Sequence, residues 1–268
     1  MSKFKVAGRC FQQLLLIVSI SLIPVGFGLM MLLYQHDQKH QENARHAVTA
    51  TLTAVDQILD RLHMAAQTAL VLAGTPCLTA KPRLLEQIEG ARYLRGLTLT
   101  MDGRPYCKTL ATSHPSPVLP EGRHSSVQLV FGSHATPNAV HVAYQLQRDN
   151  LGVIATAYGL ALRNAMRGHP GNPVVILETK EGFIWKNGDS RDQSRPTQSE
   201  FRHAGKSQQY GYTVTAGYLA GYSAQRARRT VVHTLPALAL IGVITGLISY
   251  WSIFCHCGQR NRTAVNSA

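Results

Sequence analysis

The sequence predicts an α+β domain, built on a mostly antiparallel sheet, that is flanked by two apolar helices long enough to cross a membrane. Two uncharged apolar runs lie near the ends of the 268 residues. A long stretch of helical periodicity follows the first run. Short segments rich in branched residues then alternate with turn signals, which is typical of strands.

The apolar runs are the predicted transmembrane helices, residues 14–34 and 231–254. Leu14 to Tyr34 has 21 residues without a charge, and about 20 residues at 1.5 Å each cross a hydrocarbon core of about 30 Å. The first run is too long for a cleaved signal peptide, and no small-residue cleavage site follows it. We therefore expect an uncleaved anchor and contact with the lipid bilayer at both runs.

Basic residues near the two ends predict the orientation. They precede the first run and follow the second, so the positive-inside rule places residues 1–13 and 255–268 in the cytoplasm. Residues 35–230 are then exported. Three arginines just before the second run oppose this assignment, but the first span usually dominates orientation. The supporting residues are Lys3, Lys5, Arg9, Arg260 and Arg262, and the opposing ones are Arg226, Arg228 and Arg229.

The exported region opens with a predicted helix over Gln35 to Ala73, stopped by Gly74 and Pro76. Apolar residues recur there at steps of three and four, which makes one stripe along the helix. Such a stripe packs on its own domain more often than it forms a dimer seam. The stripe consists of Val48, Leu52, Val55, Leu59, Leu62, Ala66, Ala69 and Ala73.

The remaining elements are predicted from periodicity and turn residues. Pro82 to Gly90 is a helix, and Met101-Asp102-Gly103 is the turn of a hairpin. Prolines make Ser113 to Arg123 a loop, and the polar stretch Asn187 to Lys206 is another. Further helices are Leu160 to Arg167 and Leu219 to Thr230, and the strands are Tyr93–Thr100, Arg104–Thr109, Ser126–Phe131, Val140–Gln147, Leu151–Tyr158, Pro173–Thr179, Phe183–Lys186 and Gln209–Tyr218.

The five cysteines divide between the two predicted compartments. Cys10, Cys255 and Cys257 lie at the cytoplasmic edge, where thiols stay reduced. Cys77 and Cys107 are the two cysteines of the exported region, where disulfides persist. The pair therefore forms either one intramolecular disulfide, which we favour, or two free buried thiols.

The charge pattern argues against nucleic acid as a partner. The net charge is +13, and the exported region carries 22 of the 27 bases with all 14 acids. These bases are scattered, and the predicted location holds no nucleic acid. The simpler interpretation is a solvated basic surface near anionic lipid headgroups. The more specific alternative is affinity for an anionic ligand.

A stripe of small residues lies on one face of the second apolar run, formed by Ala239, Gly242, Gly246 and Ser249. Such a stripe permits close helix packing, either with the first run of the same chain or with a second copy in a homodimer. Cys255-His256-Cys257 cannot complete a four-ligand metal site alone, and the ten exported histidines follow no metal-binding spacing. We predict no metal, no cofactor and no catalytic residue.

Several short motifs together resemble the CSS-motif sensor domain, over about residues 10 to 255. The namesake motif is Cys-Ser-Ser, and here it reads Cys107-Lys108-Thr109, so both serines are replaced. The resemblance implies a periplasmic PAS/Cache-like sensor in the bacterial inner membrane. The other matching motifs are Pro76-Cys77, Tyr93-Leu94-Arg95-Gly96-Leu97, Gly103 and Tyr210-Gly211-Tyr212-Thr213-Val214.

In enterobacterial relatives this domain precedes a cytoplasmic EAL domain, which is a cyclic-di-GMP phosphodiesterase. The resemblance implies that Cys77 and Cys107 form a redox pair: bridged by the periplasmic disulfide-forming machinery, it holds the phosphodiesterase quiet, and reduced, it favours activity. A structural staple that never changes state is the alternative.

An EAL domain needs about 200 residues and metal-binding carboxylates. After Phe254 the sequence has 14 residues, none acidic. We therefore expect a non-catalytic chain that acts on a separate EAL phosphodiesterase. The alternatives are a remnant of a truncated phosphodiesterase and a periplasmic receptor for a small molecule.

Overall fold

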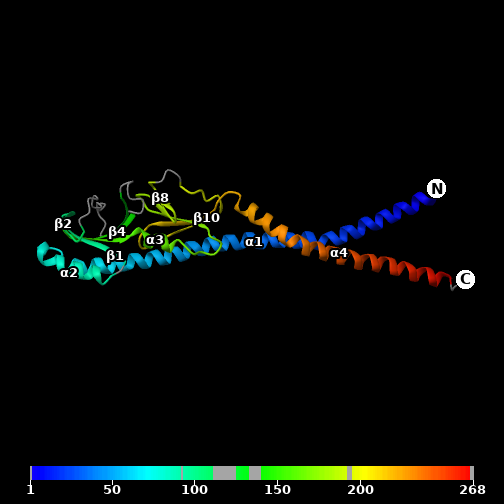
Figure 1. Cartoon of the computed structure of the whole chain (residues 1–268), viewed down its shortest axis with the longest axis horizontal. Helices are drawn as coiled ribbons and strands as arrows, with labels where there is room; N and C mark the ends of the chain where they lie inside the picture. Colours follow the sequence, from blue (N-terminus) through cyan, green and yellow to red (C-terminus); the bar gives the residue numbers. More distant parts are fainter. Residues whose placement is uncertain (1, 92, 111–124, 133–139, 192–194, 266–268) are drawn as a thin grey trace. The chain divides into compact units, whose positions relative to one another are not determined.

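The computed structural model describes residues 2–91, 93–110, 125–132, 140–191 and 195–265, and within them the side chains of residues 15–251 except 16 and 125 (Figure 1). The chain divides into two compact units. Residues 1–39 and 221–268 form one unit, and residues 40–220 form the other.

The first unit consists of two helices. It contains the beginning of α1 (Ser2–Leu70) and the whole of α4 (Tyr222–Val265). Each helix has a stretch long and apolar enough, by length and composition, to cross a membrane, and neither stretch is buried within the chain. The helix predicted from Gln35 was expected to continue the first apolar run. This prediction is confirmed, because α1 passes through both without a break.

The second unit is a mixed α and β domain with two antiparallel sheets instead of the predicted single one. The first sheet has the order β2-β1-β5-β4-β3 and the second has the order β8-β7-β6-β10-β9 (Figure 1). The strands are β1 (Leu94–Met101), β2 (Arg104–Lys108), β3 (Ser125–Phe131), β4 (Val140–Arg148), β5 (Leu151–Tyr158), β6 (Val174–Glu178), β7 (Phe183–Trp185), β8 (Gly188–Asp189), β9 (Glu200–Lys206) and β10 (Thr213–Tyr218).

The stripe on α1 is buried as predicted, with the exceptions of Leu52 and Ala73, which are half-buried. Val48 and Leu52 lie so close to β9 that a Cβ added at Gly205 would come within 2.8 Å of both side chains. α1 ends at Leu70. The next residues form hydrogen bonds between positions three apart, as in a 3₁₀ turn, and Gly74 ends this turn with a φ of +91°.

The first hairpin follows its predicted turn. Met101 pairs with Arg104, and the two residues between them, Asp102 and Gly103, have φ of 51° and 74°. Positive φ at both central positions is the type I′ geometry, which matches the twist of the strands that it joins. The loop predicted over Ser113 to Arg123 lies outside the described residues.

Asn187 to Lys206 is not the loop that we predicted, because it contains β8 and β9. β9 is an edge strand paired with β10, and most of its side chains are exposed, so it lacks the alternation of apolar residues that marks a half-buried strand. The strand predicted from Gln209 begins only at Thr213, since residues 207–212 form a turn closed by a Ser207 to Tyr212 backbone hydrogen bond.

The small helices also differ at their ends. α2 (Cys77–Glu89) begins five residues earlier than predicted, directly after Pro76. Pro82 lies in its second turn, where the missing N–H removes only one hydrogen bond of the helix. α3 (Gly159–Ala165) begins one residue before the predicted start and ends two residues before the predicted end.

Candidate functional site

Cys77 and Cys107 lie together in the structure. Their sulfur atoms are 2.06 Å apart and their Cα atoms 5.2 Å apart, which describes a disulfide between residues separated by 30 positions. Cys77 is the first residue of α2. Cys107 is 1% exposed and lies on β2, opposite Leu99 of β1.

The residue before Cys107 makes a second connection to the same part of the chain. The Tyr106 hydroxyl accepts a hydrogen bond from the Gly74 N–H, at 2.9 Å, just past the end of α1. On the other side of the junction, the Gln87 amide of α2 donates to the Ala65 carbonyl of α1, at 2.8 Å. β2 therefore holds both sides of the turn between α1 and α2.

Lys108 and Thr109 are the residues that we predicted at the places of the two serines in the namesake motif. Thr109 extends the pairing of β2 with β1: its hydroxyl accepts from the Leu97 N–H and donates to the Leu97 carbonyl, each at 3.0 Å. Lys108 is half-buried and pairs with Thr98. The Thr109 hydroxyl therefore bonds to the backbone of β1.

A second cluster joins α1 to the turn between β9 and β10. The Asp56 carboxylate of α1 accepts hydrogen bonds from the hydroxyls of Tyr212, at 2.7 Å, and Ser207, at 2.9 Å. Tyr212 is 2% exposed. Its burial, with the hydrogen bond to Asp56 and the negative charge of that group, raises the pKa of the Tyr212 phenol well above its usual value.

One helical turn further along α1, Asp60 repeats the arrangement. Its carboxylate accepts from the Tyr210 hydroxyl at 2.5 Å and from the Gln209 amide at 3.2 Å. Burial and then the hydrogen bond to Asp60 raise the pKa of Tyr210. Asp56 and Asp60 are four residues apart, so they lie on one face of the helix, toward this turn.

The next turn of α1 reaches the first sheet. Nδ1 of His63 and the hydroxyl of Tyr144, on β4, are 2.7 Å apart. The Tyr144 ring meets the Tyr210 ring edge to face, with centroids 6.1 Å apart. A polar strip along α1, formed by Asp56, Asp60 and His63, therefore contacts both sheets.

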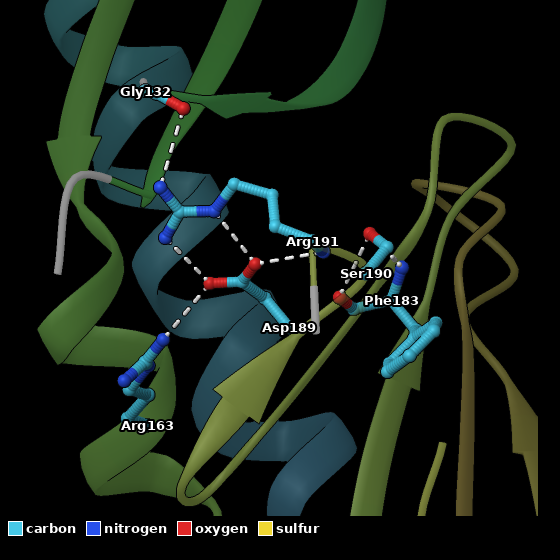
Figure 2. Close-up of polar contacts among 6 residues, drawn as sticks. All are labelled: Gly132, Arg163, Phe183, Asp189, Ser190 and Arg191. Carbon is cyan, nitrogen blue, oxygen red and sulfur yellow. Dashed lines mark hydrogen bonds and ion pairs between the residues drawn. The ribbon is translucent and has the colours of Figure 1, made fainter. Parts of the chain in front are cut away.

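A third cluster is ionic and buried (Figure 2). Asp189 of β8, whose side chain is 2% exposed, receives two hydrogen bonds of 2.8 Å from Arg191 and one of 3.2 Å from Arg163 of α3. Arg191 also donates to the Gly132 carbonyl, just after β3. Burial alone would raise the pKa of Asp189, but the bonds and charges of the two arginines together lower it.

In the first unit, two residues of the small-residue stripe face α1. A Cβ added at Gly242 would lie 3.1 Å from the Val25 side chain, and one added at Gly246 would lie 3.6 Å from Ser21. Ala239 is exposed and Ser249 half-exposed. The side chains of Cys255, His256 and Cys257 lie outside the described residues.

Sequence reasoning did not assign a role to Asp56, Asp60, Asp189 or their partners. The motif Tyr210-Gly211-Tyr212 contributed to the family resemblance, so the two tyrosines were singled out in the sequence. The motif did not indicate that their hydroxyls bind aspartates of α1. Asp56 and Asp60 sit between stripe residues on a helix, where acidic residues are usually solvated.

Comparison with known proteins identifies the domain. The model of the CSS motif domain associated with EAL matches residues 40–230. No curated protein matches the chain. The ligand-binding domain of the Campylobacter jejuni chemoreceptor Tlp3, crystallised with L-valine, is similar in structure at 12% identity and a TM-score of 0.45, over 72% of this chain and 97% of that one.

Proposed function

Because the chain belongs to the CSS-motif domain family, we propose that residues 35–230 are the periplasmic sensor of an inner-membrane system that controls an EAL phosphodiesterase, with Cys77 and Cys107 as its redox pair. The chain would act on a separate EAL protein through its two spans. The observation that carries this proposal is the position of the cysteine pair, at the junction where α1 ends and α2 begins.

The chemistry of the switch is a two-electron exchange. Oxidation of the two thiolates by the periplasmic disulfide-forming machinery forms one S–S bond, and two electrons leave with the oxidant. A dithiol reductant returns two electrons and two protons and restores both thiols. Loss of the bridge would free the start of α2 from β2 and leave the end of α1 held to β2 by the Gly74 to Tyr106 hydrogen bond. Since α1 continues into the first apolar run, this weaker attachment would allow that helix to shift.

Thiol labelling of the intact protein in membranes tests the redox pair. We expect Cys77 and Cys107 to resist a maleimide reagent until dithiothreitol is added, while Cys10 labels once the membrane is permeabilised. The signal with and without reductant should differ several-fold in the Cys10→Ser, Cys255→Ser, Cys257→Ser triple variant, in which Cys77 and Cys107 are the remaining cysteines, and not at all in the Cys77→Ser, Cys107→Ser double variant. Equal labelling of both exported cysteines without reductant would reject the disulfide.

The output is tested in cells that contain an EAL phosphodiesterase partner. If the bridge holds that enzyme quiet, the Cys77→Ser, Cys107→Ser variant should lower the cellular cyclic-di-GMP level relative to wild type, and Cys10→Ser should not. An unchanged level, with the variant protein folded and present in the membrane, would favour a structural staple.

The membrane arrangement is part of the proposal. The apolar stretches of α1 and α4 support two spans, with both termini in the cytoplasm. A periplasm-dependent reporter fused within the exported region should be active, and a reporter active only in the cytosol at the same position would overturn the topology.

We also propose that the small-residue face of α4 packs on α1 of the same chain, because Gly242 and Gly246 leave room for Ser21 and Val25. Gly242→Ile should force the helices apart and reduce cysteine crosslinking between positions 21 and 246. If instead only crosslinking between two copies falls, the stripe serves a homodimer.

A further inference from the structure

A cavity of about 300 Å³ lies between the two sheets, away from the cysteine pair. One wall comes from β3 and β4 of the first sheet, and the other from the β6–β7 and β9–β10 turns of the second. This volume is at the small end of the range for ligand pockets. All of its lining residues are in the 40–220 unit.

The walls are mainly polar, and one buried hydroxyl in them has no partner in the part of the chain that the structure describes. Oγ of Ser126, on β3, is buried and has no hydrogen-bond partner among the described residues. Buried polar atoms in proteins are nearly always bonded, to protein or to something in the cavity beside them. The Gln208 amide, which can both donate and accept, lines the same space. The Gln209 amide lines it too, but its nitrogen already donates to Asp60 and to the Tyr210 hydroxyl.

Two lysines give the cavity its charge. Lys180 lies in the β6–β7 turn and Lys206 ends β9, so ammonium groups from two separate turns line one space. Neither lysine forms an ion pair within the described ranges. Glu181 is the acidic residue of the lining, which leaves an excess of positive charge. Such a site favours an anion that also makes hydrogen bonds.

The cavity is also connected to α1. Tyr144 and Tyr210 line it, and their hydroxyls are bonded to His63 and Asp60 of that helix. A molecule that moved either ring would change a contact on the helix that runs into the first apolar stretch. The cavity thus has a direct physical route to α1 that does not pass through the disulfide.

We propose that this cavity is a binding site for a small carboxylate, held by Lys180 and Lys206 with hydrogen bonds from Ser126 and the Gln208 amide. The site would give the domain a second input besides thiol state. It stands independently of the redox role, because none of the lining residues is a cysteine.

The test uses the full chain in lipid nanodiscs, with isothermal titration of succinate and citrate against succinamide, which has the size of succinate without its charges. We expect saturable binding of at least one carboxylate and at least tenfold weaker binding of succinamide, since the neutral amides cannot form charge-assisted hydrogen bonds with the two ammonium groups. A sodium chloride blank of equal ionic strength removes general salt effects.

Two double variants assign the binding to the cavity. Lys180→Gln with Lys206→Gln should weaken carboxylate binding at least tenfold. Lys81→Gln with Lys186→Gln removes the same charge from lysines outside the lining and should leave the affinity unchanged. Circular dichroism and an unchanged melting temperature without ligand show that both variants are folded.

The outcomes separate the possibilities. No binding of either carboxylate, equal binding of succinamide, or an equal loss in both double variants would overturn the proposal. Retained binding in the Cys77→Ser, Cys107→Ser variant would show that the site does not depend on the disulfide, whereas failure of the thiol-labelling test alone leaves the cavity proposal standing.

Discussion

The two sheets are attached to their surroundings by different chemistry. In the first sheet, β2 is joined to α2 by a covalent bond between Cys107 and Cys77. In the second, the β9–β10 turn is joined to α1 by hydrogen bonds to Asp56 and Asp60. A covalent tie between sulfur atoms is broken by thiol reagents, whereas hydrogen bonds to carboxylates are not. One domain therefore has two kinds of attachment, and different substitutions remove them.

The largest effect is expected at Asp189, the buried ionic tie of the second sheet. Asp189→Ala leaves Arg163 and Arg191 without a carboxylate in a buried site, which should cost about 3 to 5 kcal/mol of unfolding free energy. The matched control is Glu178→Ala, because the Glu178 to Arg195 pair is 42% and 41% exposed and should contribute about 1 kcal/mol or less.

Chemical unfolding of the full chain in detergent measures both variants. Equal losses for Asp189→Ala and Glu178→Ala would show that burial does not distinguish the two ion pairs. The Asp189 ion pairs would then stabilise the second sheet no more than an exposed ion pair does, and would not be comparable to the disulfide of the first sheet.

The next effect is the loss of the covalent tie. Replacing both Cys77 and Cys107 with serine should lower the unfolding free energy by about 3 to 4 kcal/mol, because the bridge closes a loop of 30 residues in the unfolded chain. Hydrogen exchange should accelerate in α2, β1 and β2 and stay unchanged in β9 and β10. Faster exchange across both sheets would contradict separate attachments.

A smaller effect is expected for the hydrogen-bonded tie. Asp56→Asn weakens the bonds from Tyr212 and Ser207 and should cost about 1.5 to 3 kcal/mol. Exchange should accelerate in residues 207–212 and not in β2, which is the reverse of the cysteine variant. Asp102→Asn, in an exposed turn, is the control and should change nothing measurable.

The smallest effect concerns His169, which bonds Thr51 of α1 at 3.0 Å. Burial lowers the pKa of His169, and the charge of His46 lowers it further. The hydrogen bond that the His169 ring donates to the Ala165 carbonyl raises that pKa, but by less than burial lowers it. A lowered histidine pKa favours the neutral form, so its contribution to stability is present above about pH 6.5 and lost as pH falls below that value.

Thermal melts at pH 7.5 and 5.5 test His169. The difference between wild type and His169→Asn should be larger at pH 7.5 and should shrink at pH 5.5. A difference that grows at the lower pH would reverse the sign that we assign to this group.

Local patterns predicted part of this molecule well. The stripe from Val48 to Ala69 predicted the buried face of α1, since a period of 3.6 residues needs no knowledge of the partner. Met101-Asp102-Gly103 predicted the first hairpin, because positive φ at Asp102 and Gly103 is a local requirement. Local patterns did not predict β9. Most of its side chains are exposed, so it is a strand because it pairs with β10 and not because of its own sequence pattern.

The sequence by itself determined the long helix, the apolar runs, the strands of the first sheet and the family, because each depends on residues near one another in the chain. Only the tertiary structure decided that the strands form two sheets, that Asp56 and Asp60 meet tyrosines about 150 positions away, and that two lysines share a cavity. These depend on which distant segments pack together, and a carboxylate or lysine in a sequence carries no mark of its partner. Periodicity in the sequence indicates which face of an element is buried. The residues that this face packs against are known only from the tertiary structure.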